Sequence, residues 1–154
     1  MPDPMRQWQE LNDQATQLMS SGDYAGAAGK LVAALDISKD HWVTWLHLGL
    51  CFFNLQDFGN AIIAFQNATT LNPHDAQAWN NLGTVLGLVD EWESAATAFD
   101  SGINADPKYA KNYLGRGNAY LMAGDRQNAR AYFQRAIAVD PNYAKAKQAL
   151  SQLD

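Results

Sequence analysis

The apolar residues of this chain recur at intervals of three and four positions, which is the period of a helix that buries one face. Short polar turns, several of them containing Gly, Asp or Pro, separate these stretches. The pattern predicts an all-α chain with helices over about 4–19, 24–37, 42–54, 58–71, 109–122, 126–139 and 143–152, and a further helix pair within 76–109. Since a residue before Pro is disfavoured in the helical region, we expect helices to end near Asn72, Asp106 and Asp140.

Five columns of residue types return along the chain at a constant interval of 34 residues. The columns are Trp45, Trp79 and Tyr113; Gly49, Gly83 and Gly117; Ala61, Ala95 and Ala129; Phe65, Phe99 and Phe133; and Pro73, Pro107 and Pro141. An internal period of this size is typical of a solenoid built from helix pairs. We therefore predict one domain over 1–154, with repeats at about 8–41, 42–75, 76–109 and 110–143 and a capping helix at 143–152.

The two ends of the array differ from its middle. The first repeat has Leu11, Ala15 and Lys39 at the positions that the Trp, Gly and Pro columns occupy elsewhere. The last helix has one apolar side and a polar remainder, as a terminal cap needs; its apolar residues are Ala146, Ala149, Leu150 and Leu153.

The small and large columns have complementary roles. We expect the glycine column to leave space where two helices cross, so that their backbones can approach. The aromatic columns then fill the space beside each crossing, and each such burial stabilises the fold by about 1.5–3 kcal/mol. In the turns, Gly22 and Gly124 are expected to take the left-handed conformation that ends a helix, and Asp23 and Asp125 to cap the next helix.

The Trp–x–x–Leu–Gly motif at 45–49 and 79–83, followed by the Ala, Phe and Pro columns, resembles the tetratricopeptide repeat. The sequence departs from the usual pattern at Gln56, Asp90, Gly102, Arg116 and Arg126, without a threat to the fold. The resemblance implies a right-handed α-solenoid of four helix–turn–helix repeats plus a C-terminal capping helix. It also implies a concave groove, lined by the first helix of each repeat, that holds a peptide, a helix or another protein. The resemblance does not by itself imply any catalytic activity.

Mapped through this family pattern, the groove is expected to show the first-helix residues that do not serve the core of their own repeat. They are Leu46, His47, Leu50, Phe53, Gln77, Asn80, Asn81, Thr84, Leu88, Lys111, Leu114, Asn118 and Met122. One subgroup of the family binds a terminal carboxylate through Lys, Asn and Arg in fixed slots. Only Asn81 and Lys111 match those slots, so we do not expect a two-cation carboxylate clamp.

The helix expected at 42–54 is apolar on nearly all sides, although a helix packed on one face should show a polar side. Two explanations stay open. Either neighbouring repeats cover the second apolar side, or a bound partner or a second copy of the chain does.

The net charge and the cysteine content limit which partners and which cellular compartment we expect for this protein. The net charge of −5 opposes nucleic acid and anionic lipid, because both select clustered Lys and Arg. Only the last third is locally basic, and acidic and amide residues interrupt it, which indicates a solvated face. The single Cys51 excludes an intrachain disulfide and fits a reducing cytoplasm. We expect no signal peptide at the amino terminus and no membrane-spanning segment.

Candidate chemistry is sparse. His47 and Cys51 lie one helical turn apart, but metal sites need three or four ligands, so a packed cysteine beside a groove histidine is the better interpretation. His41 and His74 precede first helices, and we expect capping or surface roles for both. No complete catalytic site, metal site or cofactor motif is present, so we predict a protein that is not an enzyme.

The sequence therefore predicts a non-catalytic protein–protein interaction module, adaptor- or chaperone-like, that binds a peptide or helix of a partner protein in its groove. We expect the leucines and Met122 to give apolar contact, and the asparagines and Lys111 to set the register of the ligand. The alternative is a self-assembling scaffold protein that forms homo-oligomers through exposed apolar surfaces.

Overall fold

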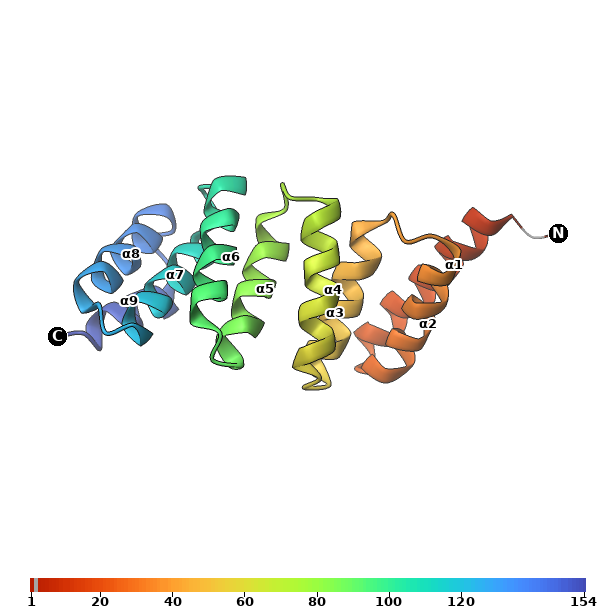
Figure 1. The fold of residues 1–154 in the computed structure, drawn as a ribbon, viewed down its shortest axis with the longest axis horizontal. Helices are drawn as coiled ribbons and strands as arrows, with labels where there is room; N and C mark the ends of the chain where they lie inside the picture. The colour runs from red at the N-terminus through yellow and green to blue at the C-terminus, as the bar shows by residue number, and fades with distance from the viewer. Residues whose placement is uncertain (2) are drawn as a thin grey trace. The chain divides into compact units, whose positions relative to one another are not determined.

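The computed structural model describes residues 1 and 3–154, and this part of the chain contains nine helices and no strand (Figure 1). The helices are α1 (Pro4–Ser20), α2 (Tyr24–Ile37), α3 (Trp42–Asn54), α4 (Phe58–Leu71), α5 (Ala76–Leu88), α6 (Trp92–Ala105), α7 (Ala110–Met122), α8 (Arg126–Val139) and α9 (Ala144–Ser151). The all-α prediction is confirmed. Helices α7 and α9 begin one residue later than expected, because Tyr109 and Tyr143 are N-cap residues with extended backbones.

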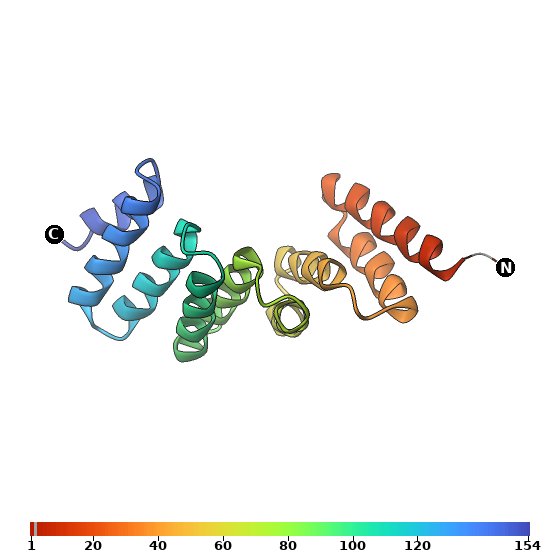
Figure 2. The same cartoon turned by 90° about the horizontal axis from the view of Figure 1, so that it is seen from above.

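The chain divides into two compact units, Met1–Asn72 and Pro73–Asp154. The first unit holds the pairs α1·α2 and α3·α4, and the second holds α5·α6, α7·α8 and the additional α9. Figures 1 and 2 show the two helices of each pair side by side from two directions. Each unit thus contains two repeats of the predicted kind, while the single domain over 1–154 stays a prediction.

The turn inside each pair is built in the same way in all four repeats. Gly22 and Gly124 have left-handed backbones, as predicted, with φ of 83° and 81°. Gln56 and Asp90 occupy the equivalent positions and are also left-handed, with φ of 59° and 63°. The aspartate that follows caps the next helix in three of the four turns: Asp23, Asp57 and Asp125 accept a backbone N–H from the residue three positions later.

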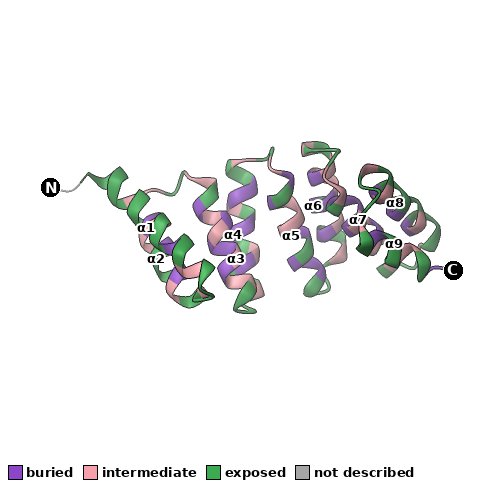
Figure 3. Ribbon diagram, turned by 180° about the vertical axis from the view of Figure 1, so that it is seen from behind, coloured by how far each residue is buried: buried purple, intermediate pink, exposed green. Residues whose placement is uncertain are grey.

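Glycine and phenylalanine interlock at the centre of each of the last three pairs. A Cβ added at Gly49 would lie 2.5 Å from Cε1 of Phe65, and the same relationship joins Gly83 to Phe99. The phenylalanine rings are almost completely buried. The glycine column therefore does more than let two backbones approach, because it makes room for the phenylalanine ring itself. Figure 3 shows how buried and exposed positions alternate along the helices.

The aromatic column ties each first helix to the loop before it. The indole N–H of Trp45 donates to the carbonyl oxygen of Lys39, and that of Trp79 donates to Pro73, both at 2.9 Å. The hydroxyl of Tyr113 donates to the carbonyl oxygen of Pro107 at the same distance. Each aromatic residue therefore fixes the start of its own helix as well as filling the core.

Neighbouring helices of the first unit cover much of the apolar helix α3. Its residues Leu48 and Cys51 join a core cluster with α1 and α2, and Trp45 and Phe52 pack against that cluster. His41, just before α3, makes no side-chain cap; its ring lies 4.0 Å from the ring of Trp8. The expectation of a capping or surface role for His41 is therefore wrong, since this half-buried ring stacks on α1.

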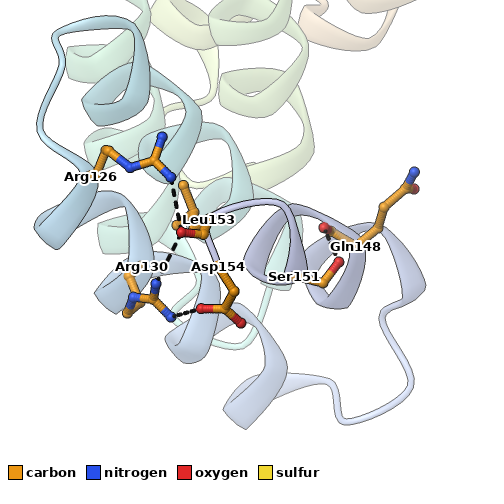
Figure 4. Close-up of polar contacts among 6 residues, drawn as sticks. All are labelled: Arg126, Arg130, Gln148, Ser151, Leu153 and Asp154. Atoms are coloured by element: carbon orange, nitrogen blue, oxygen red, sulfur yellow. Dashed lines mark hydrogen bonds and ion pairs between the residues drawn. The ribbon is translucent and has the colours of Figure 1, made fainter.

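The segment after α9 folds back against α8 (Figure 4). The guanidinium of Arg126 donates to the carbonyl oxygen of Leu153 at 2.9 Å, and Arg130 forms an ion pair of 2.8 Å with Asp154. The Leu153 side chain is buried against Ala129 and Phe133. We call these four contacting residues, Arg126, Arg130, Leu153 and Asp154, the C-terminal clasp. The clasp accounts for Arg126 at a position where the family usually has an apolar residue.

Arg116, the other unexpected arginine, also has partners inside its unit. Its guanidinium forms an ion pair of 2.9 Å with Asp100 on α6 and lies 4.0 Å from the ring centre of Tyr120. Only 18% of the Arg116 side chain is exposed. It therefore replaces an apolar core contact with a charge-assisted contact and a cation–π contact.

Candidate binding surface

Helices α5 and α7 are neighbours in the second unit, and each presents four candidate groove residues at equivalent positions. The spacing of three, four and four residues places each set on one side of its helix. All eight are exposed or half-buried; they are Gln77, Asn80, Thr84 and Leu88 on α5, and Lys111, Leu114, Asn118 and Met122 on α7. We call these eight residues the α5–α7 face.

The α5–α7 face combines apolar and amide side chains. Leu88 is 53% exposed and Met122 is 58% exposed, and each is the last residue of its helix. The side-chain amides of Asn80 and Asn118 have no hydrogen-bond partner among the described residues. The Thr84 hydroxyl donates to the carbonyl oxygen of Asn80 at 2.8 Å. The amides of Asn80 and Asn118, like that of Gln77 in the first turn of α5, are thus free to donate and accept hydrogen bonds.

Asn81 and His47, which are 34 residues apart, lie at equivalent positions in the two units and are both half-buried. Each has one buried side-chain nitrogen without a hydrogen-bond partner among the described residues: Nδ2 of Asn81 and Nδ1 of His47. Burial lowers the pKa of His47 below 6.5. Since an unpaired buried polar atom costs free energy, both positions have hydrogen-bonding capacity that their own unit leaves unused.

The candidates in the first unit are less accessible. Leu46 is only 8% exposed, whereas Leu50 and Phe53 are half-buried. The Phe53 ring lies 6.1 Å from the ring of Phe58, at the start of α4. These three apolar candidates on α3 are therefore each less exposed than Leu88 and Met122.

The structure also contains a cleft that the sequence interpretation missed. It has a volume of about 380 Å³ and lies between the loop before α7 and the loop before α9. Its lining residues are Lys108, Tyr109, Ala110, Lys111, Asp140 and Tyr143. We call it the tyrosine–lysine cleft. Lys111 belongs to both the cleft and the α5–α7 face, so the two adjoin at the first turn of α7.

The two loops at the cleft have nearly identical sequences, 106–111 and 140–145, which are 34 residues apart and read DPKYAK and DPNYAK. In both, the aspartate side chain accepts the backbone N–H two residues later, from Lys108 and Asn142. Burial raises the pKa of Tyr109, and the negative charge of Asp75 adds to the effect. Burial also raises the pKa of Tyr143, with contributions from Tyr109 and Asp140. Both hydroxyls therefore stay protonated at neutral pH and can donate hydrogen bonds.

The possible metal ligands and the Cys51 thiol were considered next. In the described part of the chain, no three His, Cys, Asp or Glu side chains are grouped closely enough to hold a metal ion. Cys51 is completely buried, and burial raises the pKa of its thiol to about 11. The thiol therefore stays protonated and is a poor nucleophile at neutral pH. Among the described residues, no helix has both the length and the hydropathy to cross a membrane.

Solved structures with the same fold share little sequence with this chain. MamA from Desulfovibrio magneticus RS-1 (residues 41 to the end) superposes with a TM-score of 0.87 at 21% identity, covering 96% of this chain and 83% of MamA. YrrB, described as a tetratricopeptide-repeat protein with an unusual peptide-binding site, has a TM-score of 0.82 at 22% identity, covering 89% and 71%. PilF from Pseudomonas aeruginosa has a TM-score of 0.85 at 16% identity, covering 97% and 68%.

A comparison with curated proteins found no match. A family model does match almost the whole chain: the cilia and flagella-associated protein 70 C-terminal domain, a tetratricopeptide-repeat domain, aligns with residues 9–153. The chain therefore belongs to this family of tetratricopeptide-repeat domains.

Proposed function

We propose that this protein is a non-catalytic protein–protein interaction module, adaptor- or chaperone-like, that binds a segment of a partner protein along the α5–α7 face. The observation that carries the proposal is the pair of equivalent stripes on two neighbouring helices of one unit. Each stripe places an amide without a partner between a polar first turn and an exposed apolar last residue.

The chemistry of the face fits a peptide ligand. Asn80 and Asn118 can each donate to and accept from a ligand backbone, since a side-chain amide has both kinds of group. Leu88 and Met122 are more than half exposed. Covering these two side chains would stabilise a complex by roughly 1 kcal/mol each, about half of the gain from full burial.

Helix α3 of the first unit, considered by itself, also presents candidate contact residues. His47, Leu50 and Phe53 are half-buried, so a ligand can reach part of each side chain. Leu46 is nearly buried and supports its neighbours more than it touches a ligand. The peptide-binding site named in the description of YrrB supports peptide binding by this repeat fold. The single, buried Cys51 supports a cytoplasmic location.

A selection from a display library of random peptides tests the proposal. We expect peptides to be enriched on the intact protein, and the affinity of an enriched peptide to fall roughly tenfold or more in the double variant Leu88→Glu/Met122→Glu. The matched control is the double variant Val32→Glu/Ile63→Glu, which places the same two charges at side chains of α2 and α4 that are 46% and 55% exposed. Enrichment of no peptide, or an equal loss in the control, would count against the α5–α7 face.

Self-association is the second candidate, and the exposed apolar residues on the second helices of the first unit favour it. Val32 on α2 is 46% exposed, and Ile63 and Leu71 on α4 are 55% and 42% exposed. An apolar surface of this kind can join copies of a chain. Sedimentation velocity over a wide concentration range separates the candidates, because a monomer at every concentration would eliminate self-association.

A further inference from the structure

We propose that the partner segment on the α5–α7 face is basic: an apolar side chain packs on Leu88, and a neighbouring Lys or Arg pairs with carboxylates just beyond the end of α5. This inference rests on the proposed function and specifies the chemistry of the partner. The carboxylates are those of Asp90, Glu91 and Glu93, in the turn after α5 and the first turn of α6, and we call these three residues the acidic turn. They lie within five residues of Leu88 in the sequence, so one ligand segment can contact both.

The apolar part of this surface lies at the end of α5. Leu88 is 53% exposed, and Val89, the C-cap residue, is 38% exposed. At the equivalent end of the neighbouring helix α7, Met122 is 58% exposed. Exposed apolar side chains that gather in one part of a surface mark interaction sites, so this end of the α5–α7 face is where we expect the apolar contact.

The acidic turn has no cation of its own. Among the described residues, its three carboxylates are exposed and form no ion pair. Residues 73–105, which include all of α5 and α6, contain five Asp and Glu residues and no Lys or Arg. The other two carboxylates are engaged, since Asp75 caps α5 and Asp100 pairs with Arg116. The negative charge that is left for a ligand is therefore concentrated in the acidic turn.

The cations of the second unit have other positions or other partners. Arg116 is in its ion pair with α6, and Arg126 and Arg130 belong to the C-terminal clasp. Lys108 and Lys111 lie at the start of α7, whereas the acidic turn follows the last residue of the equivalent helix α5. Helix α5 packs against α6 and α7, whereas the remaining cations lie on α8 and α9; they are Arg135, Lys145 and Lys147.

The equivalent turn after α7 has a different charge. Residues 124–127 are Gly, Asp, Arg and Gln, whereas residues 90–93 are Asp, Glu, Trp and Glu. The formal charges of Asp125 and Arg126 cancel, and the Asp125 carboxylate also accepts the backbone N–H of Asn128 at 3.0 Å. A Lys or Arg of the ligand is therefore attracted to the end of α5 and not to the end of α7, which fixes the direction of the segment on the face.

The backbone that carries the acidic turn is fixed. The N–H of Asp90 donates to the carbonyl oxygen of Gly87 at 3.1 Å, and that of Glu91 donates to Leu86 at 2.9 Å. The ring of Trp92 packs against Gly87, because a Cβ added there would lie 2.9 Å from two ring carbons. The three charges are thus held in place before a ligand arrives, and binding does not have to order a mobile loop.

A second copy of the chain is the rival occupant, because residues 107–154 have eight Lys and Arg against three Asp and Glu. Half of these cations already make contacts inside their own unit, since Arg116, Arg126 and Arg130 have the partners named above. The fourth, Arg135, lies 5.0 Å from the ring centre of Tyr113. We therefore favour a partner segment, whose cations do not have to leave such contacts.

The test compares two peptide display libraries on the intact protein. Both have variable apolar residues at the same positions; one has Lys or Arg beside them, and the other has Asp or Glu. We expect only the Lys/Arg library to be enriched. Replacing the Lys and Arg residues of an enriched peptide by Gln is expected to weaken binding roughly tenfold, since several exposed ion pairs each contribute a small amount. This change leaves the protein itself unaltered.

The triple variant Asp90→Asn/Glu91→Gln/Glu93→Gln makes the corresponding change in the protein. Asparagine is chosen at position 90 because it tolerates a left-handed backbone. We expect this variant to bind the Lys/Arg peptide roughly tenfold more weakly at low salt, and the difference from the wild type to shrink as the salt concentration rises. A loss that is equally large at high salt would overturn the electrostatic basis of the inference.

The matched control is Asp13→Asn/Asp36→Asn/Asp40→Asn. It removes the same net charge from three exposed carboxylates of the first unit that form no ion pair among the described residues. We expect it to change the affinity by no more than about twofold, because salt screens charges that are not in contact. An equal loss in the triple variant and in this control would overturn the assignment to the acidic turn.

The remaining outcomes separate the acidic turn from the proposed function. Enrichment of the Asp/Glu library, alone or equally with the other, would overturn the inference; the α5–α7 face would stay supported if those peptides still require Leu88 and Met122. Enrichment of neither library would overturn both. Self-association of the intact protein that the triple variant abolishes would identify a second copy as the occupant and overturn the assignment to a partner segment.

Discussion

The ring of Phe133 lies against Gly117, where an added Cβ would come within 2.5 Å of the ring carbon Cε1. Phe133 is completely buried, so its ring has little room to move away. We expect Gly117→Ala to lower the free energy of unfolding by about 1–3 kcal/mol, the usual cost of overpacking a core. Urea unfolding followed by circular dichroism measures the change.

Gly29→Ala is the matched control for this substitution. Gly29 lies inside α2, where an added Cβ would meet no atom within 4 Å. There the better helix propensity of alanine acts alone, and we expect stabilisation of about 0.5–1 kcal/mol. If both variants were stabilised equally, the contact between Gly117 and Phe133 would not limit the residue at this position.

Gln56 and Asp90 hold left-handed backbones at positions where the other two repeats have glycine. A left-handed backbone costs a non-glycine residue about 1–2 kcal/mol, so replacing that residue by glycine removes this cost. The greater flexibility of glycine in the unfolded chain offsets part of the resulting gain in stability. We expect Gln56→Gly and Asp90→Gly each to stabilise the protein by a few tenths to about 1 kcal/mol. Destabilisation in urea by both variants would show that their side chains stabilise the turns by more than the backbone strain costs.

Helix order and bounds follow from the sequence because local signals agree with the packing. The three-and-four spacing, the aspartate caps at Asp23 and Asp125, and the Pro column each mark the same elements. The backbone strain at Gln56 was hidden, because nothing in its local sequence signals a positive φ. The 34-residue register nevertheless aligns Gln56 with Gly22. The repeat period therefore indicates a left-handed backbone at Gln56, although the residue type does not.

The binding surface could be predicted only in part. The register places the residues of the α5–α7 face on equivalent sides of their helices, but it does not say that Leu46 is nearly buried while Leu88 is half exposed. That difference depends on which neighbouring helices cover each residue. The tyrosine–lysine cleft was missed because its walls come from two loops that only tertiary packing brings together. The repeated DPKYAK and DPNYAK segments were the available signal.

His47 is expected to make stability depend on pH. Burial lowers its pKa from 6.5, so the unfolded chain binds a proton at a higher pH than the native protein does. Its contribution to stability is thus fully present above pH 6.5 and is lost as the pH falls from there through the lowered pKa. We expect urea unfolding on either side of pH 6.5 to show a larger loss in the wild type than in His47→Asn. Equal losses would contradict this role.

The C-terminal clasp is expected to hold α9 against α8. Both arginines are partly exposed, and solvent weakens the Arg130–Asp154 ion pair. The hydrogen bonds to the Leu153 carbonyl oxygen nevertheless keep the buried Leu153 side chain in place. We expect Arg126→Ala/Arg130→Ala to speed amide hydrogen exchange in α9 roughly tenfold while α5 and α6 stay unchanged. Unchanged exchange in α9 would mean that Leu153 burial alone fixes the helix.

The binding of a partner segment by the α5–α7 face is tested most directly by amide chemical-shift mapping. An unlabelled peptide from the display selection would be titrated into the isotopically labelled protein. We predict the largest shifts at the residues of the α5–α7 face, including the side-chain amides of Asn80 and Asn118. The largest shifts on the exposed sides of α6 and α8, with these asparagine amides unmoved, would contradict the account.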